Sequence, residues 1–166
     1  MAQEALLGAA GRVSLLPLDT FRKILVPVDM STDSHYALEV ALELQSRFGS
    51  EVEIVTLTEF GENEEFNRGL GAERTDDDLE DSARERLRRF VENVAPDAID
   101  RVVCRAIEEV DLPNGIDHLA TDWGATLVVL TSHDRPGVFR TLSEKIMKTL
   151  DVPVLLLKSH SGAPPR

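Results

Sequence analysis

The sequence predicts an α/β fold, a doubly wound, five-stranded parallel sheet with helices on both faces. Five short apolar runs alternate with four amphipathic segments along the chain, and such alternation is typical of a sheet covered by helices. The first strand, helix and strand together take about 35 residues, the length of a right-handed crossover between parallel strands. No internal repeat or second core is visible, so we expect one domain.

The first strand is predicted at residues 23–29 (KILVPVD), a nearly continuous apolar run. Such a run is expected of a strand that is covered on both faces, and Pro27 belongs near its end. Residues 31–34 then offer several N-cap side chains, and Gly49 stands where a helix-ending glycine is expected. The apolar positions between them recur at helical spacing: Ala37, Val40, Ala41, Leu44 and Phe48.

The middle of the chain continues the alternation. Residues 52–57 predict the second strand, and the polar stretch 58–75 predicts a long loop. A second helix begins near Asp76, with acidic residues first and arginines later, the order that suits the helix dipole. The expected buried face of this helix consists of Leu79, Ala83, Leu87, Phe90 and Val94.

The last part of the chain completes the sheet. We expect a third strand at residues 99–107 and a helix opened by Pro113 and closed by Gly124. A fourth strand follows at 126–130, and a last helix is marked by Leu142, Ile146 and Leu150. The fifth strand, residues 152–157, is expected at the edge of the sheet. Because a long apolar edge is prone to pair with another chain, it is also the expected site of dimerisation.

Composition excludes several classes of function. The net charge of −12, from 30 acidic and 18 basic residues, opposes binding to nucleic acid or to an anionic membrane. The one cysteine, Cys104, rules out an internal disulfide and a multi-cysteine metal site, and it fits a reducing compartment. No apolar run approaches the roughly 18–20 residues that cross a bilayer, and the N-terminus does not resemble a secretory signal. We therefore expect a cytoplasmic protein.

A ligand of such a sheet binds at the carboxyl ends of the strands, where the strand order reverses. Two segments should meet there, the end of the first strand (Pro27, Val28, Asp29) and the loop 131–137. The carboxylate of Asp29 either accepts hydrogen bonds from a ligand or caps the following helix. Both roles remain open from the sequence.

Four motifs, in order along the chain, carry a family resemblance: ILVPVD-x-S, AL-x-x-AL-x-L, TLVVLTSHDRPG and SEKIMKTLDVPVLLLK. Together they resemble the universal stress protein domain over residues 21–158. The resemblance leaves residues 1–20 as an N-terminal extension and 159–166 as a tail. It implies the adenine nucleotide alpha hydrolase-like fold and a homodimer, often paired through the last strand.

In nucleotide-binding members of this family, the resemblance implies an ATP site. Its adenine side matches Asp29, and its phosphate loop has the form G-x-x-G-x9-G-[ST]. This chain has Thr131 and Asp134 in place of two glycines, and Leu142-Ser143 lacks the third. Glycine allows positive φ and a close approach of backbone N–H groups to phosphate, so ATP binding is predicted to be lost, with no cofactor. The candidate nucleotide pocket consists of Pro27, Val28, Asp29, Thr131, His133, Arg135, Gly137 and Ser143.

Three functional hypotheses follow. The leading one is a non-enzymatic, homodimeric stress-response protein that binds another protein, with the 58–75 loop as a contact. The second is a sensor of ATP or AMP that uses Asp29 and the 131–143 loop. The third, a nucleotide hydrolase, finds little support, because Ser132 and His133 are adjacent and no G-x-S-x-G elbow is present. The histidines show no metal-ligand spacing, so no metal or catalytic residue is predicted.

Overall fold

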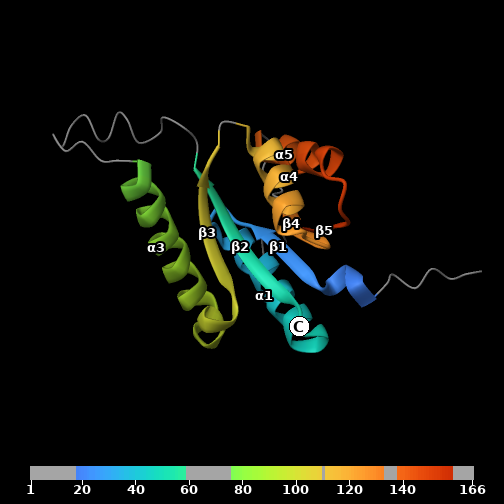
Figure 1. The fold of residues 1–166 in the computed structure, drawn as a ribbon, viewed down its shortest axis with the longest axis horizontal. Coiled ribbons are helices and arrows are strands. Elements are labelled where there is room, and N and C mark those ends of the chain that lie inside the picture. The colour runs from blue at the N-terminus through green and yellow to red at the C-terminus, as the bar shows by residue number, and fades with distance from the viewer. Residues whose placement is uncertain (1–17, 59–75, 110, 133–137, 159–166) are drawn as a thin grey trace, which may run out of the picture.

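The chain forms a five-stranded sheet in a computed structural model, which describes residues 18–58, 76–109, 111–132 and 138–158 (Figure 1). The strand order is β3-β2-β1-β4-β5, and every neighbouring pair is parallel. The strands are β1 Lys23–Pro27, β2 Glu51–Thr58, β3 Val103–Glu108, β4 Leu127–Ser132 and β5 Val154–Lys158. The predicted doubly wound α/β fold is confirmed.

The described residues also form four α-helices and two 3-10 turns, of which all but the first turn lie between strands. The helices are α1 Thr32–Phe48, α3 Asp76–Val94, α4 Leu112–Trp123 and α5 Val138–Thr149, and the turns are η1 Leu18–Phe21 and η2 Pro96–Arg101. Glycines end two helices in the left-handed region, Gly49 at φ 68° and Gly124 at φ 72°. A residue with a Cβ is strained at such an angle, so the predicted helix ends at both glycines are confirmed. None of the helices in these ranges is long and apolar enough to cross a membrane.

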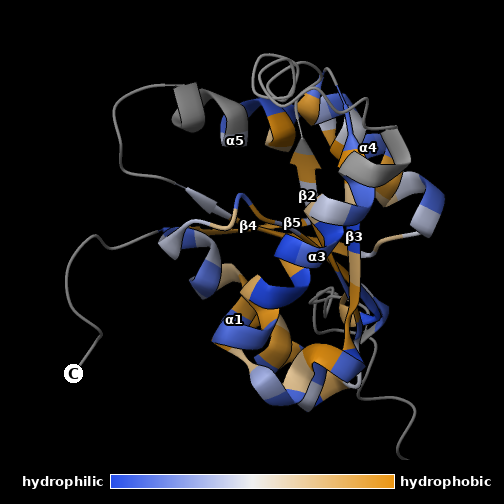
Figure 2. Cartoon of the chain, turned by 90° about the vertical axis from the view of Figure 1, so that its left-hand side faces the viewer, coloured by the Kyte–Doolittle hydropathy of each residue, from blue (hydrophilic) through white to orange (hydrophobic). Residues whose placement is uncertain are grey.

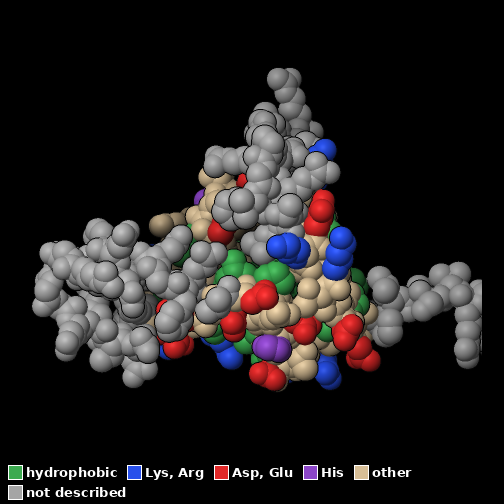
Figure 3. Space-filling view, turned by 90° about the horizontal axis from the view of Figure 1, so that it is seen from above, with side chains coloured by type: hydrophobic (Ala, Val, Ile, Leu, Met, Phe, Trp, Pro, Cys, Tyr) green, Lys and Arg blue, Asp and Glu red, His purple; other side chains and the backbone are tan. Residues whose placement is uncertain are grey.

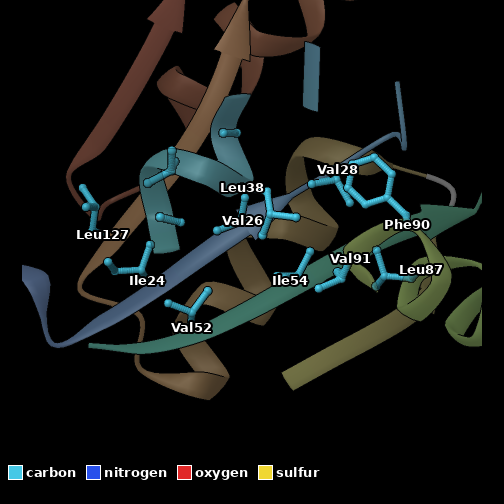
Figure 4. Close-up of a cluster of buried hydrophobic side chains, with 13 residues drawn as sticks. Ile24, Val26, Val28, Leu38, Val52, Ile54, Leu87, Phe90, Val91 and Leu127 are labelled. Carbon is cyan, nitrogen blue, oxygen red and sulfur yellow. The ribbon is translucent and has the colours of Figure 1, made fainter. Parts of the chain in front are cut away.

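The helices cover the sheet in two layers with separate cores (Figure 2). Strand residues such as Ile24, Val26 and Ile54 meet Leu38 of α1 and Leu87 of α3 on one face (Figure 4). On the other face, β1, β2 and β4 pack against α4 and α5. Burial of each aliphatic side chain contributes roughly 1.5–3 kcal/mol to the stability of the fold. The two cores together therefore hold the strand ends in place.

The amino ends of β1 and β4 are joined by hydrogen bonds between residues 103 positions apart. The Lys23 N–H donates to the Thr126 hydroxyl at 2.9 Å, and the Thr126 N–H donates to the Lys23 carbonyl at 2.8 Å. The Lys23 ammonium donates to the Trp123 carbonyl at 3.0 Å and lies 5.2 Å from the centre of the Trp123 ring. These contacts hold the two central strands together where they begin.

Two local predictions were wrong. The third strand begins at Val103 rather than at Ile99, because Pro96 starts a 3-10 turn that buries Ala98. The buried face of α1 consists of Ser34, Ala37, Leu38 and Ala41. Phe48, expected on that face, is 48% exposed and stacks on Phe21 with 4.7 Å between ring centres.

Candidate functional site

The candidate site lies at the carboxyl ends of β1 and β4, where the strand order reverses. From β1 the chain continues on one side to β2 and β3, and later returns to the other side of β1 as β4 and β5. The register pairs Leu25 with Val128. Seen from above (Figure 3), acidic and hydrophobic side chains lie next to one another on the part of this surface that the structure describes.

The chain turns sharply where β1 ends. Pro27, expected near the end of the strand, is its last residue, so β1 ends two residues earlier than predicted. The Val28 N–H still donates to the Val55 carbonyl at 2.8 Å. Val28 is buried, and Met30 has a φ of 58°, in the left-handed region. A side chain seldom adopts this angle, so the turn requires support from its neighbours. Met30 packs against the core formed with α1 and α3.

Asp29 occupies this turn and is bonded to the start of α1. Its Oδ1 accepts hydrogen bonds from the Ser31 N–H at 2.9 Å and from the Ser34 hydroxyl at 2.6 Å. The Asp29 N–H in turn donates to the Ser34 hydroxyl oxygen at 3.2 Å. Ser31 is the N-cap residue but makes no capping hydrogen bond with its own side chain. The carboxylate of Asp29 therefore braces the helix start, where a negative charge is favourable.

The end of β4 is bonded to its neighbours through two hydroxyl groups. Ser132 donates to the Leu157 carbonyl of β5 at 3.4 Å. Ser143 of α5 donates to the Thr131 carbonyl at 3.3 Å, and Ser143 is buried. Thr131 and Ser143, at opposite ends of the segment expected to hold a phosphate, are therefore in direct contact.

The structure brings only part of the predicted pocket into view. Pro27, Val28, Asp29, Thr131 and Ser143 lie at the switch point as expected. The predicted residues His133, Arg135 and Gly137, as well as Asp134 and the 58–75 loop beyond Thr58, lie outside the described residues. Within the described ranges, no group of three His, Cys, Asp or Glu side chains could hold a metal ion.

Two structural features were not predicted from the sequence. The first is Ser34, whose hydroxyl both donates to and accepts from Asp29. The available signal was a serine at the third position of the helix.

The second feature is Glu53, a carboxylate in the apolar run of β2 whose side chain is only 1% exposed. Arg105 on β3 lies 2.7 Å from it. An acidic residue in an otherwise apolar strand was the signal here, because a buried charge requires a partner.

The family model for the universal stress protein family matches residues 20–158. The chain belongs to the universal stress protein family. This agrees with the resemblance carried by the four sequence motifs over residues 21–158. Among curated proteins none matches the chain.

Solved structures share the fold at low sequence identity. The hypothetical protein MJ0577 is 21% identical, with a TM-score of 0.61 over 86% of this chain and 99% of its own. A universal stress family protein from Burkholderia pseudomallei is 23% identical, with a TM-score of 0.58 over 83% and 96%. A universal stress protein in complex with cAMP is 15% identical, with a TM-score of 0.59 over 83% and 97%. At these identities the likeness establishes the fold alone.

Proposed function

We propose that this universal stress protein is a non-enzymatic, cytoplasmic stress-response protein that acts as a homodimer and no longer binds ATP. Its output is contact with another protein, and the 58–75 loop is the proposed contact. The dimer forms through the β5 edge, where Leu156 is 37% exposed and the other apolar residues are half-buried.

The hydrogen bond between Ser143 and Thr131 carries the proposal that ATP binding is lost. A phosphate loop needs hydroxyl and backbone N–H groups that face the ligand. Here the Ser143 hydroxyl donates within the chain, and its side chain is buried against the end of β4. Thr131 adds a Cβ where the family pattern has glycine. Both features favour direct packing of α5 on the end of β4 over a phosphate cradle.

The contacts of Asp29 support the same proposal from the other side of the switch point. Its Oδ1 already accepts two hydrogen bonds from the start of α1, one of them from the buried Ser34. A ligand amino group that approached this oxygen would have to share it or displace a serine hydroxyl. Charge-assisted hydrogen bonds of this kind contribute roughly 1.5–3 kcal/mol each, so displacement would oppose binding.

A nucleotide sensor is the second candidate function, since a structural neighbour of this chain is a universal stress protein in complex with cAMP. In this alternative, the adenine group contacts Asp29, and the 131–143 segment holds the phosphate by another arrangement.

Thermal unfolding with ATP, AMP and cAMP, with and without Mg²⁺, tests the two candidates. We expect no change in melting temperature at millimolar nucleotide. A ligand present at a hundred times its Kd would instead stabilise the fold by about 2.7 kcal/mol, which raises the melting temperature of a domain of this size by several degrees.

A matched pair of variants makes this test specific. Asp29→Ala removes the carboxylate, whereas Ser34→Ala removes its brace and leaves the carboxylate in place. A nucleotide-dependent stabilisation that survives in Ser34→Ala and is lost in Asp29→Ala would overturn the proposal, because it would assign Asp29 to the ligand.

A further inference from the structure

Glu53 and Arg105 form an ion pair on the face of the sheet, away from the switch point. Arg105 Nε lies 2.7 Å from Glu53 Oε1, and the side chains are 45% and 1% exposed, respectively. The two residues come from adjacent strands, since Glu53 pairs with Val103 in the register and Arg105 pairs with Val55. The ion pair therefore crosses from β2 to the edge strand β3.

This pair lies on the side of the sheet that carries α4 and α5. Leu25, the register partner of Glu53, and Val55, the partner of Arg105, both belong to the core on that side. The helices do not extend over the first half of β3, where Val103 is 53% exposed (Figure 1). The Arg105 side chain therefore covers the buried carboxylate of Glu53 and is itself partly exposed to water.

The contact depends on charge rather than on a well-aligned hydrogen bond. Glu53 Oε1 is buried and, among the described residues, has no hydrogen-bond partner, although Arg105 Nε is close to it. Burial raises the pKa of Glu53 above its usual value, and the positive charges of Arg105 and Lys23 only partly offset this effect. Desolvation thus outweighs attraction, as is common for buried ion pairs.

We propose that Glu53 and Arg105 form a latch operated by a single proton. When Glu53 is ionised, its charge holds the Arg105 side chain down on the sheet. When Glu53 takes up a proton, that attraction is lost, and the guanidinium moves into water, where it regains hydration and rotamer freedom. Mild acid therefore presents an unpaired cation beside the exposed Val103.

The latch opens without weakening the fold. Because the folded protein binds the Glu53 proton more tightly than the unfolded chain does, the contribution of this group to stability falls as pH rises from the unfolded to the folded pKa. As the pH falls through this range, protonation of Glu53 therefore increases its contribution to the stability of the folded protein. Besides Arg105, the charge of Lys23 on β1 acts on Glu53. Lys23 itself donates to the Trp123 carbonyl, and the exposed Glu51 lies two positions before Glu53 on β2.

Nuclear magnetic resonance of the full chain tests this directly. The Arg105 Nε–H signal, assigned by its loss in Arg105→Lys, is followed as the pH is lowered from 7.5 to 4. We expect it to move to the position of a solvated arginine, with faster exchange with water. Its midpoint should lie above the ordinary glutamate value of 4.5 and coincide with the titration of the Glu53 carboxyl carbon.

Two matched variants give the controls. Glu53→Gln, which mimics the protonated state, should show the solvated Arg105 signal at every pH. Glu51→Gln removes an exposed carboxylate on the same face and should follow the unmodified protein. An Arg105 signal that does not change with pH, or a Glu53 midpoint at or below 4.5, would overturn the proposal; both readouts come from the unmodified chain, so they remain valid if a variant fails to fold.

Discussion

The two edge strands of the sheet expose different surfaces. Along β5, the residues before Lys158 are apolar, and the structure leaves Leu156 37% exposed. Along β3, the charged residues Arg105 and Glu108 interrupt the apolar ones, α3 packs on one face, and Arg105 is paired with Glu53 of β2 on the other. Charged side chains on an edge discourage pairing with another chain, whereas an apolar edge invites it.

We therefore expect the two edges to make different contacts, β3 within the chain and β5 with a second copy. The β3 edge is held within the chain by α3 and by the ion pair with Glu53 of β2. The β5 edge instead presents a run of four apolar residues, Val154 to Leu157, which fits the proposed pairing with a second copy. Three substitutions, taken in order of expected effect, can break or sharpen this comparison.

The largest effect is expected at the β3 edge from Arg105→Met. Removal of one partner leaves Glu53 buried without its counter-charge. We therefore expect the free energy of unfolding, measured with urea at pH 7.5, to fall by about 2 kcal/mol. This is below the 3–5 kcal/mol found for fully buried pairs, because the Arg105 side chain is 45% exposed and water screens its charge. The loss should shrink as the pH falls, since a protonated Glu53 needs no counter-charge.

A double substitution provides the control for this loss. Glu53→Met combined with Arg105→Met removes both charges and should recover most of the stability, as hydrophobic replacements of buried ion pairs do. If the double variant is less stable than Arg105→Met alone, the loss arises from packing rather than from an uncompensated charge.

The next effect is expected at the β5 edge from Leu156→Lys. A charge on the exposed apolar residue of this strand should raise the dissociation constant of the proposed homodimer at least tenfold, which is about 1.4 kcal/mol. Analytical ultracentrifugation over a concentration series measures the change. A chain that is already monomeric at micromolar concentration would refute pairing through β5.

The smallest effect is expected from Val103→Lys, the matched change at the opposite edge. Val103 is more exposed than Leu156, so we expect a change in stability within about 0.5 kcal/mol and an unchanged dissociation constant. A loss of dimer in this variant, with Leu156→Lys unaffected, would place the interface on β3 instead of β5.

The fold followed from the sequence because its signals are local. Apolar runs, helical spacing and the glycines Gly49 and Gly124 each report on a few neighbouring residues. The helix ends at both glycines were confirmed, whereas the helical spacing placed Phe48 wrongly on the buried face of α1. The start of the third strand was wrong for a related reason. Ile99 continues an apolar pattern, but Pro96 fixes its own φ and lacks an N–H, so the chain first makes a 3-10 turn.

The candidate site could be placed but not resolved from the sequence. The switch-point rule located Asp29 and Thr131, yet the hydroxyl contacts that engage them depend on rotamers and on the packing of α1 and α5. The ion pair of Glu53 was even harder to predict from the sequence. Its partner is 52 positions away, and only the strand register, which no local pattern specifies, brings Arg105 beside it.

The bond between Lys23 and Thr126 also constrains how the chain is made. Its partners are 103 residues apart, so the centre of the sheet closes late, after most of the chain has left the ribosome. Until then β1 has β2 as a neighbour but lacks β4, and its other edge is bare. A nascent chain of this protein therefore depends on the rapid arrival of β4, and any pause before Thr126 is translated prolongs the time in which an apolar strand edge is exposed to other chains.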